Sequence, residues 1–324
     1  MIKVAVVGAT GLVGETILDE LTQRDYEVEI RLLASAQSAG QKALYKDKEL
    51  VIEELTKRSF EGIDYALFAV EGELSRQFVP LAVDAGCTVI DNSSTYRMDS
   101  AVPLVIPELN PEALEHHSGI IANPNCSTIQ SVVPLSALVP YGLKRVIYTT
   151  YQSVSGSGKA GIEDLERGQK GEKQQFYPVP IANNVIPQID SFLDNDYTKE
   201  EQKMIDETKK ILGLPDLKVT ATTVRVPLNS GHSVAILIET IQPFEVTDVK
   251  LALADTPGLV LIDTPEYPTP LQVHGRNDIL VGRVRRDDSA ENSLHIWCVA
   301  DNIRKGAAGN AVQILDTLLQ RREI

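Results

Sequence analysis

The chain has 324 residues, of which 43% are hydrophobic and 23% are charged. These proportions are those of an ordinary globular protein, and they exclude a disordered chain. The length favours about two domains. Asp and Glu outnumber Lys and Arg by 45 to 31, which gives a net charge of −14. Because a nucleic-acid-binding surface must be basic, this charge argues against DNA or RNA as a partner.

The sequence also argues against a secreted or membrane-bound protein. Met1 leads straight into a strand pattern without a signal peptide, and no apolar run approaches the ~18 residues of a membrane helix. Cys87, Cys126 and Cys298 are odd in number and far apart, so they predict neither a disulfide framework nor a metal site. We therefore expect a cytoplasmic protein with reduced thiols, no metal and no membrane partner.

The first part of the chain alternates strand and helix patterns. A β-branched run opens it, and a helical pattern follows with Val13, Ile17 and Leu21 on one face. Such alternation predicts parallel strands joined by crossover helices, which is a doubly wound α/β sheet. We expect strands at residues 2–7, 28–33, 50–53, 65–69, 88–90, 104–106 and 120–122.

The second part has longer strand patterns and fewer helices between them. This pattern predicts an α+β domain with a mixed or antiparallel sheet. We expect its strands at residues 145–151, 218–227, 232–241, 259–262, 279–285 and 293–300.

Three helices are expected in the second half of the chain. A short one is predicted near 162–167. A longer one spans 198–213, because Thr198 and Glu201 have capping-box spacing and Gly213 can end the helix. The last, over 311–319, is amphipathic and should pack back on the first domain. We therefore expect one domain over 1–125 plus 304–324 and a second over 126–303.

A glycine loop follows the first strand. Gly8, Gly11 and Gly14 lie between a strand and a helix, where they permit a tight turn, close approach of the backbone to a pyrophosphate, and close packing of the helix on the sheet. The pyrophosphate would bind the N–H groups at the start of the helix. This arrangement predicts a Rossmann-type dinucleotide-binding domain; the alternative is a purely structural turn.

The end of the second strand bears on the choice of cofactor. An acidic residue there would bind the ribose 2′-OH of NAD and repel a 2′-phosphate. The sequence instead has Ser35 and Ser38, whose hydroxyls can donate to phosphate. The pattern favours NADP. The alternative is that this polar loop contacts no ligand.

Cys126 is a candidate nucleophile. It begins a helix after Asn125, and the positive end of a helix dipole favours the thiolate form. Cys87 and Cys298 lie in apolar strand patterns and are expected to be inert. From position alone, Cys126 could also be a buried small residue.

Among five histidines, His232 is the best candidate for an acid or base, because it opens a strand after the Asn229–Gly231 loop. Arg225 lies in an otherwise apolar strand and needs a partner. That partner is either a carboxylate of a ligand or an internal salt bridge.

Several separated motifs together resemble the aspartate-semialdehyde dehydrogenase family, in the form found in Gram-positive bacteria. The match spans nearly the whole chain. The motifs are residues 8–14, Asp91–Ser94 with Arg97, Pro124–Thr128, Gln152–Gly156, Glu200–Lys203, Arg225–Pro227, Gly231–Ser233, and Asp301–Asn302 through Lys305–Ala308.

The resemblance implies NADP-dependent reductive dephosphorylation of L-aspartyl-4-phosphate to L-aspartate-4-semialdehyde and phosphate. It also implies a homodimer or homotetramer built from a dinucleotide-binding domain and a catalytic, dimerising domain. In that family Cys126 would form a thioester, His232 would be the general acid and base, and Gln152 would orient the acyl intermediate.

The remaining roles that the resemblance implies concern substrate and cofactor. Arg225 would hold the substrate α-carboxylate and Glu200 its amino group, while Arg97, Lys203 and Asn125 would hold the phosphate. Glu200 and Lys203, three residues apart on one helix, could equally be an ordinary surface ion pair. The implied cofactor contacts are Gly8, Thr10, Gly11, Leu12, Val13, Gly14, Ser35, Ser38, Ser155, Gly156 and Asn310.

Two alternatives and one departure remain. N-acetyl-gamma-glutamyl phosphate reductase has similar chemistry, and a dinucleotide-binding regulator without turnover would keep the glycine loop but need no Cys–His pair. Gln37 stands where family members often carry Arg. The loss of that charge leaves NAD use open as well.

Overall fold

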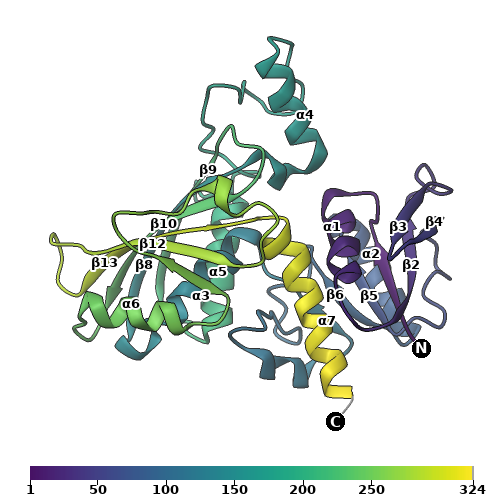
Figure 1. Ribbon diagram of the computed structural model, residues 1–324, viewed down its shortest axis with the longest axis horizontal. Helices are drawn as coiled ribbons and strands as arrows, with labels where there is room; N and C mark the ends of the chain where they lie inside the picture. The colour runs from purple at the N-terminus through teal and green to yellow at the C-terminus, as the bar shows by residue number, and fades with distance from the viewer. Residues whose placement is uncertain (323–324) are drawn as a thin grey trace. The chain divides into compact units, whose positions relative to one another are not determined.

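The computed structural model describes residues 1–322. The chain divides into two compact units: Met1–Pro124 with Ala307–Ile324, and Asn125–Gly306. Each unit is built around its own sheet (Figure 1). In the described part of the chain, no helix combines the length and the apolar character needed to cross a membrane.

The first unit contains a seven-stranded sheet in the order β3-β4-β2-β1-β5-β6-β7. All neighbours are parallel except β3 and β4, which form an antiparallel hairpin at one edge. The strands are β1 (Ile2–Val7), β2 (Val28–Ala34), β3 (Lys42–Tyr45), β4 (Lys48–Glu54), β5 (Tyr65–Phe68), β6 (Thr88–Asp91) and β7 (Ile120–Ala122).

Strand β1 lies between β2 and β5, so the strand order reverses at its end. The carboxyl ends of parallel strands at such a reversal form the ligand-binding crevice of doubly wound folds. The loop after β1 contains Gly8 and leads into α1 (Leu12–Thr22). The doubly wound sheet and the placement of the glycine loop are therefore as predicted.

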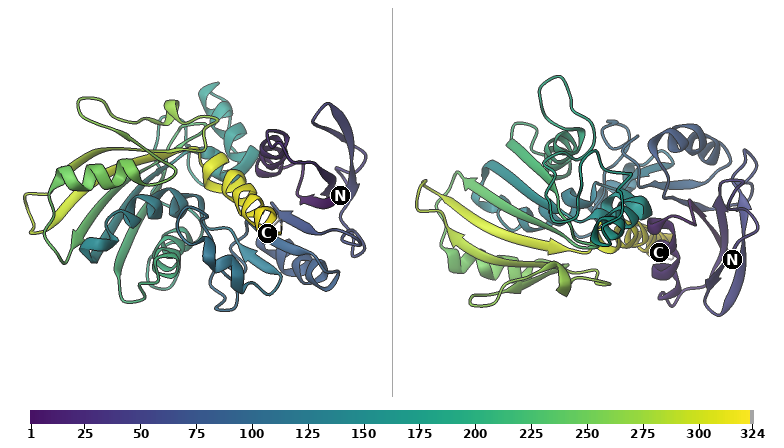
Figure 2. Two further views of the ribbon diagram at one scale, coloured as in Figure 1. Left: turned by 60° about the horizontal axis from the view of Figure 1, so that its bottom comes forward. Right: turned by 90° about the horizontal axis from the view of Figure 1, so that it is seen from above.

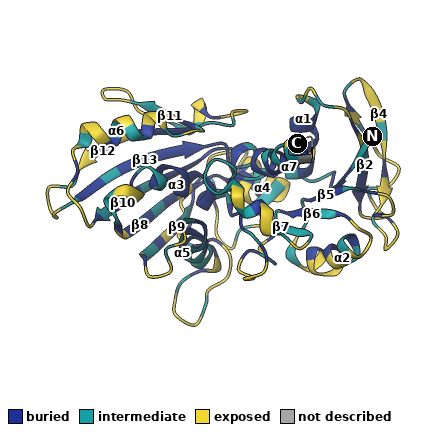
Figure 3. Ribbon diagram, turned by 90° about the horizontal axis from the view of Figure 1, so that it is seen from below, coloured by how far each residue is buried: buried dark blue, intermediate teal, exposed yellow. Residues whose placement is uncertain are grey.

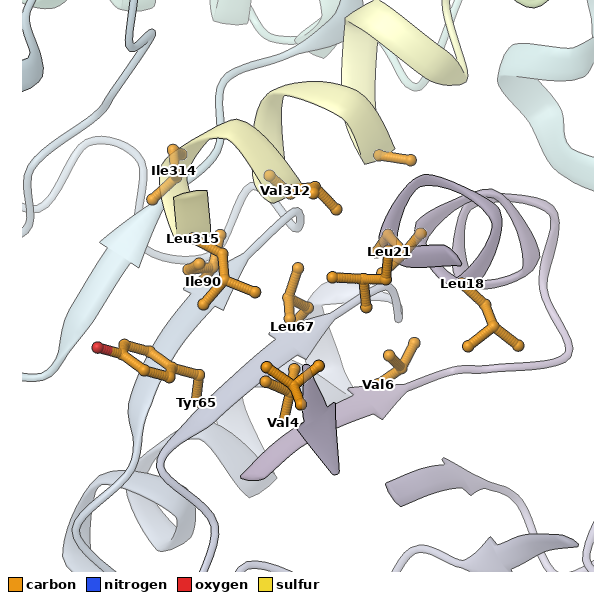
Figure 4. Packing of buried hydrophobic residues seen from close by; sticks show 14 of the residues in the cluster. Val4, Val6, Leu18, Leu21, Tyr65, Leu67, Ile90, Val312, Ile314 and Leu315 are labelled. Atoms are coloured by element: carbon orange, nitrogen blue, oxygen red, sulfur yellow. The ribbon is translucent and has the colours of Figure 1, made fainter. Parts of the chain in front are cut away.

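The core of the first unit joins segments from both ends of the chain. Helix α7 (Gly309–Arg322) contributes Val312 and Leu315, which pack with Leu21 of α1 and Ile90 of β6 (Figure 4). Asp316 of α7 also forms an ion pair with Arg24 at 3.0 Å. The terminal helix thus packs on the first unit, as its apolar stripe predicts. Helix α2 (Gly72–Asp84) packs on β6.

The second unit contains a six-stranded mixed sheet in the order β11-β12-β13-β10-β8-β9 (Figure 2). Pairs β8–β9 and β11–β12 are parallel and the other pairs are antiparallel. The strands are β8 (Leu143–Gln152), β9 (Lys218–Arg225), β10 (His232–Thr240), β11 (Leu259–Ile262), β12 (Ile279–Arg286) and β13 (Ser293–Ala300). This confirms the predicted α+β class.

One face of this sheet is covered by helices. Helix α3 (Cys126–Ser136) packs on β10 and β13, and α5 (Lys199–Leu212) packs on β9. Tyr148 of β8 faces this side, where its Oη hydrogen-bonds Thr208 Oγ1 of α5 at 3.0 Å. Strands β10 and β13 are therefore largely buried (Figure 3). Helix α4 (Gly158–Gln169) follows the short helix η3 (Val154–Ser157).

The opposite face of the same sheet is less covered. Side chains alternate along a strand, so Tyr151 of β8 and Trp297 of β13 point away from the helices. Their rings lie 5.5 Å apart, and Tyr151 remains 39% exposed. The loop after β11 crosses part of this face, where Trp297 Nε1 donates to the Pro268 carbonyl at 3.0 Å. Beside that loop is an open hollow of about 430 Å³.

One predicted strand is absent from the structure, and two observed elements were not predicted. Residues 104–106 do not form a strand; Leu104 makes only an isolated parallel bridge with Ala122. Helix α6 (Val246–Asp255) was not predicted, because only Val249 and Leu253 of its residues are buried and the apolar stripe is correspondingly weak. Strand β3 was also missed, since it lies at the sheet edge and only Tyr45 is buried.

Candidate active site

Cys126 is the first residue of α3, because Asn125 caps that helix. The Asn125 backbone is extended, and its Oδ1 accepts the N–H groups of Ser127 at 2.9 Å and Thr128 at 3.2 Å. The sulfur therefore lies at the positive end of the helix dipole, which favours the thiolate. Cys126 is also partly accessible to solvent.

The other two thiols lie in quite different surroundings. Both are buried, and burial raises the pKa of Cys87 to about 11 and that of Cys298 to about 12. Cys87 Sγ donates to the Ile63 carbonyl at 3.1 Å. Since the thiolate is the nucleophilic form, these two residues are suited to packing, not to chemistry.

Gly306 provides the space beside Cys126. A Cβ atom at position 306 would lie 2.8 Å from Cys126 Cβ, closer than two such carbons can approach. The Gly306 N–H in turn donates to the Asp301 carbonyl at 3.0 Å. The segment after β13 therefore passes next to Cys126, and position 306 in this segment has no room for a side chain.

Glu200 connects the start of α3 to the end of β8. Its Oε1 accepts Asn125 Nδ2 at 2.9 Å and Gln152 Nε2 at 3.1 Å. The backbone N–H of Asn125 donates to a second carboxylate of α5, Glu207 Oε2, at 2.7 Å. Helix α5 begins at Thr198 with the predicted capping box, which fixes the position of its first turn.

The charge of Glu200 is stabilised inside the protein. Burial alone would raise its pKa, but the Lys203 ammonium, hydrogen bonds from Asn125 and Gln152, and the Arg225 charge together hold the pKa at about 2. Lys203 Nζ lies 3.2 Å from Glu200 Oε2 and 2.9 Å from Asp190 Oδ2. The pair is thus only partly a surface ion pair: Glu200 is 5% exposed, whereas Lys203 reaches solvent.

Arg225 ends β9 and is 5% exposed. Its Nη1 donates to the Ser153 carbonyl at 2.7 Å. Within residues 1–322 no carboxylate lies within ion-pair distance of its guanidinium, so the internal salt bridge considered from the sequence does not form. A buried guanidinium without a carboxylate partner is suited to binding an anionic ligand.

His232 begins β10 and is fully buried. Its Nδ1 accepts the Ser153 backbone N–H at 3.0 Å, while Nε2 has no hydrogen-bond partner in the described residues. Burial, and then the Arg225 charge, lower its pKa to about 3. The ring is therefore neutral at ordinary pH.

Helix α3 brings Cys126 and His232 into one region. Gln130 lies one turn after Cys126 on the same side of the helix, and its Nε2 donates to the His232 carbonyl at 3.2 Å. A second connection runs through Gln152, which binds Glu200 and is followed by Ser153, the partner of His232. The structure thus gathers Cys126, Asn125, Gln152, Glu200, Lys203, Arg225 and His232 in the second unit.

The glycine loop of the first unit has the expected constraints. Gly8 has a φ of +87°, and a Cβ there would lie 2.3 Å from the Ala69 carbonyl oxygen. A Cβ at Gly14 would lie 2.1 Å from the Gly8 carbonyl oxygen. Gly11 is the N-cap residue of α1 and has no side chain. The N–H groups of Leu12 and Val13 at the start of the helix are therefore not covered by a capping side chain. These residues fit a dinucleotide.

The loop after β2 lies next to the glycine loop. Thr10 Oγ1 is 3.4 Å from Ser38 Oγ, and Ser35 is exposed. The Ser38 N–H donates to the Ser35 carbonyl at 2.9 Å, which closes a turn. Neither serine is paired with a carboxylate of residues 1–322, so both hydroxyls suit a phosphate ligand.

Arg97 and Asn310 lie in the first unit. Arg97 is buried and donates to the carbonyls of Asn123 at 2.9 Å and Asn92 at 2.7 Å. Asn310 Nδ2 donates to Asn123 Oδ1 at 2.7 Å and to the Val105 carbonyl at 3.0 Å. Its buried Oδ1 has no partner in the described chain, so it is available to an amide donor such as a nicotinamide carboxamide.

Ser155 and Gly156, predicted to contact the cofactor, lie in the second unit close to His232. A Cβ at Gly156 would lie 3.1 Å from His232 Nε2 and 2.8 Å from Arg225 Nη1. Ser155 Oγ lies 3.1 Å from Asn302 Oδ1. A side chain at position 156 would therefore crowd both the imidazole and the guanidinium.

Asn302, Ser153 and Glu207 were not predicted as site residues. Asn302 and Ser153 belong to motifs that carry the family resemblance, but nothing in those motifs assigns them contacts. Glu207 is one of several charged residues of α5, and neither its burial nor its contact with Asn125 can be read from the sequence. Across residues 1–322, no group of three or more His, Cys, Asp or Glu side chains could hold a metal ion.

Known proteins resemble this chain over almost its full length. The family model described as "Semialdehyde dehydrogenase, NAD binding domain" matches residues 3–117, and that described as "Semialdehyde dehydrogenase, dimerisation domain" matches residues 133–305. The aspartate-semialdehyde dehydrogenase of Bacillus subtilis (strain 168) is 46% identical, with 98% of this chain and 97% of the relative covered.

Solved structures agree with these matches. Aspartate semialdehyde dehydrogenase II from Vibrio cholerae, complexed with ASA, has a TM-score of 0.94 and 43% identity over 99% of this chain and 98% of that one. The enzyme from Candida albicans with NADP has a TM-score of 0.80 and 26% identity over 100% of each chain. The sequence motifs, the two domain matches and the fold lead to one conclusion: the chain belongs to the aspartate-semialdehyde dehydrogenase family.

Proposed function

We propose that this protein catalyses the NADPH-dependent reductive dephosphorylation of L-aspartyl-4-phosphate to L-aspartate-4-semialdehyde and phosphate, with Cys126 as the nucleophile. The observation that carries the proposal is the connection of Cys126 to His232 within one unit. A thiol at a capped helix N-terminus lies one turn from Gln130, which binds the His232 carbonyl.

The chemistry begins at the sulfur. The Cys126 thiolate attacks the acyl carbon, a C–S bond forms, and the C–O bond to phosphate breaks, so that phosphate leaves. The thioester is more reactive toward hydride than a carboxylate. NADPH, when bound, supplies that hydride. Breakage of the C–S bond then releases the aldehyde and returns the thiolate.

His232 acts on the oxygen that becomes negatively charged during reduction of the thioester. Its Nε2 lies next to Gly156 and has no hydrogen-bond partner in the described residues. An oxyanion within hydrogen-bond distance of such a donor is stabilised in a water-poor site. Gln152, held by Glu200 at 3.1 Å, orients the acyl group.

The charged residues match the charges of aspartyl phosphate. Arg225 holds the α-carboxylate, since its guanidinium has no carboxylate partner in the described chain. Glu200, ionised with a pKa of about 2, holds the ammonium group. Lys203 and Arg97, with Asn125, hold the phosphate. Because the chain carries a net charge of −14, these cations must be concentrated where two polyanions bind.

NADP is proposed as the cofactor, held by the glycine loop, Ser35, Ser38 and Asn310. The absence of an acid after β2 in the sequence, the exposed Ser35 and the half-buried Ser38 support NADP. Because Gln37 stands where a cation would bind the 2′-phosphate, the preference for NADP is weakened and some use of NAD is expected. The relative from Candida albicans was solved with NADP.

We also propose that the protein is a homodimer or homotetramer in the cytoplasm. The less covered sheet face, with Tyr151, Trp297 and the hollow of about 430 Å³, offers an apolar surface for a second copy. The family model over residues 133–305 is that of a dimerisation domain. All three cysteines are free, as in a reducing compartment.

The assay follows NADPH formation at 340 nm with aspartate semialdehyde, phosphate and NADP. We expect activity with aspartate semialdehyde. Activity only with N-acetylglutamate semialdehyde would assign the protein to the related reductase. No activity with either aldehyde, for folded protein with reduced thiols, would contradict an enzyme and favour a dinucleotide-binding regulator.

The cysteines supply matched variants for the nucleophile. Cys126→Ala should abolish turnover, whereas Cys87→Ala and Cys298→Ala should retain it, because burial keeps those two thiols protonated. Mass spectrometry after iodoacetamide treatment of the folded protein should find Cys126 alkylated first. Equal losses of activity in all three variants would show that the nucleophile is wrongly assigned.

A further inference from the structure

We infer that Asn302, acting through Ser153, holds His232 as the tautomer with its proton on Nε2, so that the neutral ring donates a hydrogen bond to the reacting oxygen. This inference rests on the proposed function and adds a positioning residue to it. It also specifies how His232 works: as a hydrogen-bond donor, with no free lone pair facing the substrate.

The tautomer follows from the partner of Nδ1. The Ser153 backbone N–H lies 3.0 Å from His232 Nδ1 and can only donate, whereas the Ser153 hydroxyl, 3.1 Å from the same nitrogen, can donate or accept and fits either tautomer. A proton on Nδ1 would face that N–H at the same distance, so Nδ1 must present its lone pair. In the neutral ring the proton is then on Nε2.

The charged groups around the ring preserve this neutral state. Arg225 at the end of β9 opposes a positive charge on His232, and Glu200 of α5 favours one. Burial adds to the effect of Arg225, and together they exceed the effect of Glu200, so the pKa of His232 falls to about 3. Protonation of both nitrogens would also break the bond from Ser153.

Asn302 fixes both segments that flank the ring. It is 1% exposed, and its Oδ1 accepts the Gly231 N–H at 3.0 Å and the Ser153 hydroxyl at 3.1 Å. Gly231 directly precedes His232, and Ser153 supplies the donor to Nδ1. One amide oxygen therefore joins the backbone of the histidine to the backbone that sets its tautomer.

Two more contacts complete this arrangement. The Ser155 hydroxyl also lies 3.1 Å from Asn302 Oδ1, while Gln130 Nε2 binds the His232 carbonyl from α3. Nε2 remains without a partner in the described chain, on the side of Gly156, where a Cβ atom would lie 3.1 Å from it. A buried N–H with no protein acceptor points to a ligand acceptor.

The first experiment reads the tautomer directly. Protein labelled with 15N-histidine is examined by NMR at pH 7.5, and the His232 signals are identified by their absence in His232→Gln. We expect an unprotonated Nδ1 and a protonated Nε2. A protonated Nδ1 in the wild type would overturn the inference. Because the spectrum is independent of turnover, it is informative even if the proposed reaction is wrong.

The second experiment tests Asn302. Asn302→Ala should lose the single-tautomer signature and lower kcat by about tenfold to a hundredfold, with KM changed less than about threefold, since the donor is misplaced. Asn302→Asp keeps the accepting oxygen and should restore both. The matched control is Asn184→Ala, at an exposed asparagine of the same unit, which should behave as wild type.

The results distinguish positioning from simple packing. A wild-type spectrum and wild-type kcat in Asn302→Ala would overturn the role of Asn302. If that variant does not fold, Asn302→Asp decides: a single Nε2–H tautomer and near-normal kcat support the inference, and a lost tautomer in folded protein contradicts it.

Discussion

The burial of a neutral His232 should make the second unit sensitive to acid. The unfolded chain binds a proton at this residue below a pH of about 6.5, whereas the folded state does so only near pH 3. Protons therefore favour the unfolded state, and stability is lost as the pH falls through this window. The perturbation that tests this is His232→Gln, which cannot bind a proton but can still accept from the Ser153 N–H.

The magnitude follows from the two pKa values. At pH 5.0, about 1.5 units below the pKa of the histidine in the unfolded chain, protonation stabilises the unfolded state by about 2 kcal/mol. The folded state, with a pKa of about 3, gains almost none of this free energy. At pH 7.5 the contribution is close to zero. Wild type should thus lose about 2 kcal/mol more than His232→Gln between these two pH values.

Trp297 makes the measurement specific. It is the only tryptophan in the chain, and it pairs with Ala235 in the same sheet as His232. Urea unfolding followed by Trp fluorescence, at fixed protein concentration, gives the free energy of unfolding of the second unit. The control is His274→Gln in the same unit, whose side chain is 79% exposed. It should keep the pH dependence of wild type.

The comparison subtracts every other titrating group, because both proteins share them. Equal pH dependence in wild type and His232→Gln would refute the reasoning, since it would mean that His232 gains its proton as easily in the folded state as in the unfolded chain. A larger loss in the variant than in wild type would refute it as well.

Three further predictions concern other residues. Gly306→Ala places a Cβ 2.8 Å from Cys126 Cβ and should lower kcat about a hundredfold in the NADPH assay, and an unchanged kcat would show that the nucleophile has room to move. Glu200→Gln should destabilise the protein by about 3 kcal/mol above pH 4.5 in urea unfolding, because the folded pKa is about 2. That difference should shrink as the pH falls toward 2, and a constant difference would contradict the pKa. Gln37→Arg should raise the ratio of kcat/KM for NADP over NAD about tenfold, and no change would exclude this loop from 2′-phosphate binding.

The sequence predicted features that depend on local chemistry. Thr198 and Glu201 specify the start of α5 through hydrogen bonds within one turn, and the structure contains that capping box. The β-branched runs predicted the central strands, where burial on both faces requires them. The glycine loop was predicted from the spacing of its glycines between a strand and a helix, and Gly14 is required by the Gly8 carbonyl only six residues away.

Features that depend on distant parts of the chain could not be predicted. Arg225 needed a partner, but its actual partner, the Ser153 carbonyl, is 72 residues away and carries no side-chain signal. Asn302 looks like any asparagine after a strand until folding brings Gly231 and Ser153 to its Oδ1. The edge strand β3 and helix α6 were missed because few of their residues are buried.

Helix α5 binds Asn125 through two carboxylates, and the spacing of these carboxylates limits which insertions and deletions the helix can tolerate. Glu200 accepts a hydrogen bond from the Asn125 side chain. Glu207, seven residues further on, accepts one from the Asn125 backbone N–H. Seven residues are close to two full turns, so both carboxylates lie on one side of the helix. Insertion or deletion of a single residue between them would rotate one carboxylate by about 100° around the helix axis. One of the two hydrogen bonds to Asn125, the N-cap of α3, would then be lost. Point substitutions at the half-buried Gln202 and Asp206 between them should be tolerated, whereas length changes there should be eliminated by selection.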